Sequence, residues 1–146
     1  MIDTSFILTQ KIDRLHDKST YQSLWKNIGD FIKNKKIVIY SEIQCEIKDN
    51  DILLWLKDQG CTVISVDDNV QKNVTQVVTN YPKLLDFTHC TSSADAFLIA
   101  TAILYNLIII TQERQNTPNK IPYISDKMGV QSININQLCK LENWIF

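Results

Sequence analysis

Apolar residues spaced three and four apart predict helices in the first half of the chain. In residues 21–33 this spacing gives one apolar face, and it recurs from Asp51 to Gly60 and across residues 67–81, where Pro82 stops the pattern. Two apolar runs between these segments, at 35–40 and 61–65, predict buried strands. Ser41 and Gln44 have the spacing of a capping box for a helix after the first of these strands.

The second half continues the alternation. Residues 92–106 are apolar nearly all round, as in a helix covered on most sides, with Ser92 and Asp95 placed to begin it. Residues 107–111 then form the strongest strand pattern in the chain. Further elements follow, and they are a short helix from Pro122 to Gly129, a strand at 130–133 and a last helix through Leu138 and Leu141.

Strands that alternate with helices predict an α/β fold. We expect a three-layer α/β/α sandwich with a central, mostly parallel sheet. With 146 residues, 45% of them hydrophobic, the chain can form one core, so a single domain over 1–146 is expected.

Composition removes several classes of function. The formal charge of −1 gives no global attraction to nucleic acid or an anionic membrane, and no apolar run is long enough to span a bilayer. Without a recognisable secretory signal, a cytoplasmic location is expected. The isolated glycines exclude a phosphate-binding loop. The cysteines lack metal-ligand spacing and are expected to be buried, reduced thiols, and they are Cys45, Cys61, Cys90 and Cys139.

Four acidic residues fall where predicted strands end or helices begin. Asp3 follows the first apolar residues, Glu46 lies on the helix after the 35–40 strand, Asp95 opens the 92–106 helix, and Glu113 follows the 107–111 strand. Ligands of open parallel sheets bind beyond the carboxyl ends of the strands, so we expect these acids to share one edge.

Gathered carboxylates need a cation. Two carboxylates about 4 Å apart repel by about 1 kcal/mol in water and about 4 kcal/mol at an effective dielectric of 20. Oxygen ligands without histidine or thiolate select Mg²⁺ or Mn²⁺, which activate water for phosphodiester hydrolysis. Taken singly, each acid has a simpler explanation in helix capping or solvation, and that explanation is preferred for Glu42, Asp49 and Asp126.

The acidic segments resemble the four motifs of PIN-domain nucleases, in order. They are MIDTS, the EI of SEIQCEI, SADAFLIATA and IIITQE. The stretches SLWKNI, EIKDNDILLWLKDQ and KIP with ININQL are similar to a prokaryotic PIN-like branch known mainly as a domain of unknown function. The resemblance implies that Asp3, Glu46, Asp95 and Glu113 bind the metal, supported by hydroxyls of Thr4, Ser5 and Thr111. It also implies an endoribonuclease that acts on RNA, often the toxin of a toxin–antitoxin pair restrained by a small protein, with homodimers common.

A different class of function is a catalytically silent module that keeps the fold and binds protein or RNA. The near-neutral charge favours it, because nucleic-acid binders usually cluster Lys and Arg. The densest basic runs are Lys33, Lys35 and Lys36, and Lys11, Arg14 and Lys18, and both are interpreted as solvated faces. The aromatic residues Trp144 and Phe146 are expected to pack the last helix rather than form an interface.

Overall fold

The computed structural model of the chain describes residues 1–3, 6, 20–84 and 94–145. The predictions made for Thr4, Ser5, Ser92 and Phe146, for Cys90 and for the basic run at 11–18 lie outside these residues.

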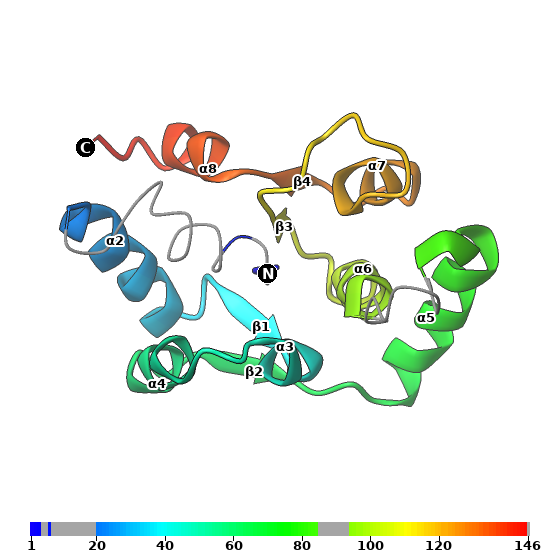
Figure 1. The fold of residues 1–146 in the computed structure, drawn as a ribbon, viewed down its shortest axis with the longest axis horizontal. Coiled ribbons are helices and arrows are strands. Elements are labelled where there is room, and N and C mark those ends of the chain that lie inside the picture. The colour runs from blue at the N-terminus through cyan, green and yellow to red at the C-terminus, as the bar shows by residue number, and fades with distance from the viewer. Residues whose placement is uncertain (4–5, 7–19, 85–93, 146) are drawn as a thin grey trace.

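The described residues form a mixed α/β structure in which helices and short strands alternate (Figure 1). The elements are α2 (Gln22–Lys33), β1 (Val38–Tyr40), α3 (Ser41–Glu46), α4 (Asn50–Asp58), β2 (Thr62–Ile64), α5 (Asp68–Asn80), the 3₁₀ helix η1 (Pro82–Leu84), α6 (Ala94–Tyr105), β3 (Ile109–Ile110), α7 (Ile121–Lys127), β4 (Ser132–Ile133) and α8 (Ile135–Leu141). The predicted order of elements is confirmed across these ranges.

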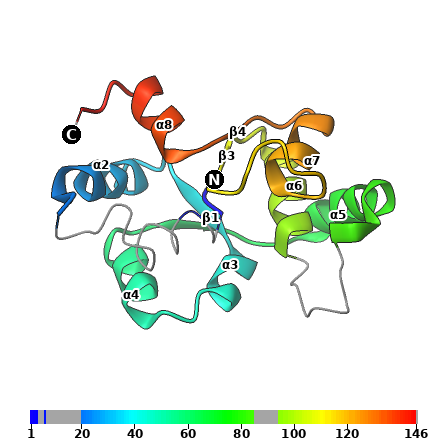
Figure 2. The same cartoon turned by 45° about the horizontal axis from the view of Figure 1, so that its top comes forward.

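The strands pair in parallel, as predicted, but as two sheets of two strands each. β1 pairs with β2, and β3 pairs with β4. The N-terminal residues connect the two pairs. The Ile2 N–H donates to the Val38 carbonyl at 3.1 Å, and Ile2 forms a parallel bridge with Ile110 on its other side. Figures 1 and 2 both show the N-terminal residue between β1 and β3.

Helix packing encloses this centre. The buried face of α2 presents Leu24, Ile28 and Ile32, as its apolar spacing predicts. Helix α6 is buried on most of its circumference and packs against α5, α3 and α7, which explains why its sequence is apolar nearly all round. The ring of Trp144 contacts that of Phe31 edge-on, with centroids 4.8 Å apart, so the packing prediction for Trp144 is confirmed.

Three local predictions are wrong. Ser41 is the first helical residue of α3 and Tyr40 is the N-cap, so the hydroxyl of Ser41 is not at the capping position and no capping box forms. Strand β2 is not fully buried, since Val63 is 37% exposed, because β1 is the only strand paired with it within the described ranges.

The third wrong prediction concerns the cysteines. Cys45 is exposed, because α3 turns Ile43 rather than Cys45 toward the core, while Cys61 and Cys139 are partly buried. All three are free thiols, as expected.

Two helix ends agree with the sequence. Gly60 follows α4 with φ +67° and Gly129 follows α7 with φ +75°, a conformation that glycine adopts without steric cost. None of the helices in the described ranges is long and apolar enough to cross a membrane.

Candidate active site

Asp3 lies at the centre of the site. It follows the Ile2 bridge, its N–H donates to the Ile110 carbonyl at 2.9 Å, and it is only 4% exposed. The buried Thr111 follows β3, and its hydroxyl donates to Asp3 Oδ2 at 2.9 Å. The same Thr111 oxygen accepts the Glu113 N–H at 3.2 Å. One hydroxyl therefore connects the first and fourth predicted acids, which lie 110 positions apart in the chain.

Asp95 is held near this edge by a contact that the sequence did not indicate. The buried Tyr40 hydroxyl, at the end of β1, donates to the Ala94 carbonyl at 3.1 Å. This hydrogen bond places the first turn of α6, with Asp95, beside the carboxyl end of β1. A terminal tyrosine in an apolar strand carries no signal for such a role, because its partner is 54 residues away.

The charges around Tyr40 and Asp95 show which acids share the pocket. Burial raises the pKa of Tyr40, and the charges of Glu46, Asp3, Asp95 and Glu42 raise it further, so the phenol keeps its proton and remains a donor. Burial also raises the pKa of Asp95, with contributions from Asp3, Glu113 and Glu46, to about 7. All four predicted acids therefore interact electrostatically at one edge.

Glu113 is engaged by the start of α7. The Ile121 N–H donates to Glu113 Oε2 at 2.9 Å, and the Lys120 ammonium lies 3.5 Å from Oε1. Lys120 also lowers the pKa of Asp95. Sequence reasoning missed Lys120, because residues 112–120 have no periodic pattern that would show where the loop returns.

The remaining acids differ in their roles. Glu46 is partly buried at the end of α3 and raises the pKa of both Tyr40 and Asp95. Asp49 caps α4 by accepting the N–H groups of Asp51 and Ile52, which agrees with the simpler explanation chosen for it. Asp126 is exposed on α7, and Glu42 lies in the first turn of α3.

A comparison with protein-family models decides the family. Residues 1–146 match the model described as Domain of unknown function (DUF4411). The chain belongs to the DUF4411 family. None of the curated proteins compared with it gives a significant match. The description of the family assigns no activity, so a function for this DUF4411 protein has to be argued from its site.

The donor set of the DUF4411 site fits a hard divalent cation in its chemistry. Its ligating groups are carboxylate and hydroxyl oxygens, without histidine or thiolate, and they concentrate negative charge. Within residues 1–3, 6, 20–84 and 94–145, however, no group of three or more His, Cys, Asp or Glu side chains is arranged to hold a metal ion. The carboxylates share a field, and one of them is already engaged by Lys120.

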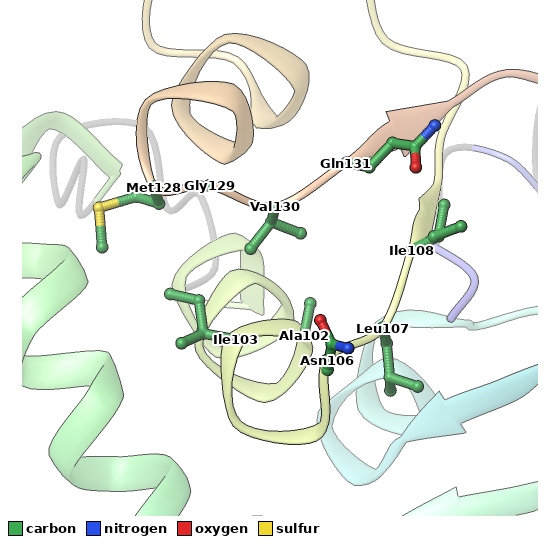
Figure 3. A pocket seen from close by; sticks show the side chains of 9 residues that line it. All are labelled: Ala102, Ile103, Asn106, Leu107, Ile108, Met128, Gly129, Val130 and Gln131. Carbon is green, nitrogen blue, oxygen red and sulfur yellow. The ribbon is translucent and has the colours of Figure 1, made fainter.

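A separate cavity of about 480 Å³ lies at the other edge of β3 and β4 (Figure 3). Its lining comes from the residues just before these two strands, whereas the acids follow strand ends. The lining residues are Ala102, Ile103, Asn106, Leu107, Ile108, Met128, Gly129, Val130 and Gln131. This cavity is therefore distinct from the acidic edge.

Proposed function

We propose that this DUF4411 protein is a divalent-metal-dependent endoribonuclease that hydrolyses RNA phosphodiesters, and that it acts as the toxin of a toxin–antitoxin pair. The observation that carries the proposal is the convergence of Asp3, Glu46 and Glu113 on Asp95, whose pKa their charges raise to about 7. A cluster of this kind has a strong affinity for a cation. The toxin role and a small antitoxin partner rest on the resemblance of the acidic motifs to PIN-domain nucleases.

The proposal includes a finer architecture. Hydrogen bonds from Met1–Asp3 to β1 and to β3 support the order β2, β1, N-terminal residues, β3, β4 in one parallel sheet. Helices on both faces would complete the three-layer, PIN-like sandwich as a single domain over 1–146. In that sheet Asp3 stands at the middle of the carboxyl edge, where a ligand of an open α/β sheet binds.

Each residue has a part that follows from its contacts. Asp3, Glu46 and Asp95 would hold Mg²⁺ or Mn²⁺, with Glu113 as the fourth acid. When bound, such an ion activates water and neutralises charge on the phosphoryl group. Thr111 fixes the rotamer of Asp3 through its hydroxyl, and Tyr40 fixes the position of α6 and with it Asp95.

A cavity of about 470 Å³ supports RNA as the substrate. It begins at Gln115, two residues after Glu113, and continues along α7 past the ring of Tyr123 and the ammonium of Lys127. Amide side chains, an aromatic ring and a lysine are groups that bind nucleotides by hydrogen bonding, stacking and charge.

The test is cleavage of a mixed RNA pool by purified protein in Mg²⁺. We expect cleavage by the wild type, loss on addition of EDTA, and a fall of about 100-fold or more in Asp3→Asn and Asp95→Asn. Asp58→Asn is the matched control, because Asp58 is exposed at the end of α4. Equal activity in all samples would indicate a contaminating nuclease and contradict the proposal.

A catalytically silent module that binds protein or RNA is the second candidate. It is favoured by the engagement of Glu113 with Lys120 and by the formal charge of −1. Retention of RNA by the wild type and by Asp95→Asn, with no cleavage by either in Mg²⁺ or Mn²⁺, would support it.

A further inference from the structure

Both carboxylate oxygens of Glu113 have partners at the start of α7. Oε2 accepts the Ile121 N–H at 2.9 Å, and Oε1 lies 3.5 Å from the Lys120 ammonium. A carboxylate engaged in this way offers its oxygens to a second cation only if Lys120 gives one up.

Lys120 is placed to be exchanged. Its side chain is 53% exposed, while that of Glu113 is 19% exposed, so the ammonium reaches the carboxylate from the solvent side. Its backbone is the extended N-cap of α7, and the helix itself is held by the Ile121 N–H. Exposed ion pairs contribute little to stability, so the loss of this contact would leave α7 in place.

The charge of Lys120 reaches beyond Glu113. It lowers the pKa of Asp95, opposite in sign to the effects of Asp3, Glu113 and Glu46 on the same group. One monovalent charge therefore offsets part of the repulsion among four acids. A divalent ion carries twice that charge and interacts correspondingly more strongly with each carboxylate.

We propose that the Lys120 ammonium is a built-in counter-ion of the acidic site, which competes with a divalent cation for Glu113 and is released when the cation binds. The inference rests on the proposed function, because it requires that the acids bind Mg²⁺ or Mn²⁺. It makes Lys120 a regulator of metal affinity, and in the released state its ammonium is available to an anionic substrate.

The first test is the affinity for Mn²⁺, measured by electron paramagnetic resonance of the free ion. Lys120→Met removes the competing charge, and we expect binding about three- to tenfold tighter than in the wild type. Lys127→Met is the matched control, because Lys127 lies on the same helix over the ring of Tyr123, 5.7 Å from its centroid. Its affinity is expected to equal that of the wild type.

The outcomes separate the two proposals. Mn²⁺ binding that is equal in wild type, Lys120→Met and Lys127→Met overturns the role of Lys120 and leaves the metal site intact. A failure of all three proteins to bind Mn²⁺ overturns both the metal site and the competition.

A second measurement uses the wild type, so it does not depend on the folding of a variant. Lysines are acetylated with a limiting amount of reagent, with and without Mg²⁺, and the modification at each position is read by mass spectrometry. We expect Mg²⁺ to increase acetylation of Lys120 and to leave Lys127 unchanged. No increase at Lys120, at a Mg²⁺ concentration that saturates the site, contradicts its release.

Discussion

At the scale of single residues, Asp95 reports the state of the acidic edge. Burial and the charges of Asp3, Glu113 and Glu46 raise its pKa from the ordinary 3.8 to about 7. In the folded protein Asp95 therefore holds a proton between about pH 4 and pH 7, where the unfolded chain has lost it. Folding binds a proton in this window, so the contribution to the free energy of unfolding is full below about pH 4 and is lost as the pH rises to 7.

Asp95→Asn removes this dependence, because asparagine is neutral at every pH. In EDTA at pH 8 we expect the variant to exceed the wild type in free energy of unfolding by about 1 to 3 kcal/mol, and the difference to shrink toward pH 4. Urea unfolding at several pH values measures it, with Asp58→Asn as the control. A variant that is less stable than the wild type by the same amount at every pH would show that Asp95 is not repelled by its neighbours.

At the scale of secondary-structure elements, a single hydroxyl joins β1 to α6. The Tyr40 hydroxyl and the Ala94 carbonyl are buried together, so removing the donor leaves an acceptor without this hydrogen bond. Tyr40→Phe is expected to lower the free energy of unfolding by about 1 to 2 kcal/mol and to increase amide hydrogen exchange in the first turn of α6.

The control for this variant is Tyr123→Phe, which removes a hydroxyl from a ring that is 36% exposed. It is expected to leave both the stability and the exchange rates as in the wild type. If Tyr40→Phe behaves like this control, the hydroxyl does not position α6.

The elements also show how far the sequence could predict the structure. Helices α2, α4, α5 and α6 follow from apolar spacing, and Gly60 and Gly129 mark helix ends, because these signals act within a few residues. The length and pairing of the strands could not be predicted, since β3 is set by contacts with Met1 on one side and with residues of β4 on the other. The N-cap of α3 was missed by one residue, which is sufficient to remove a predicted cap.

At the scale of the whole molecule, the candidate site is built from segments at both ends of the chain. The sequence pointed to Asp3, Glu46, Asp95 and Glu113 because each follows a strand or lies on an adjoining helix, and the structure gives all four an electrostatic interaction with one another or with Tyr40. The sequence could not reveal Lys120 or Tyr40, whose roles depend on the path of a loop and on a contact across 54 residues.

The most direct measurement of the central claim is anomalous diffraction from crystals of the wild type grown with Mn²⁺. We expect one dominant anomalous peak within about 2.5 Å of carboxylate oxygens of Asp3 and Asp95, with Glu46 in reach, and its loss in crystals of Asp95→Asn. Mn²⁺ found only elsewhere on the surface, with the same positions in both proteins, would contradict a metal site built from these acids.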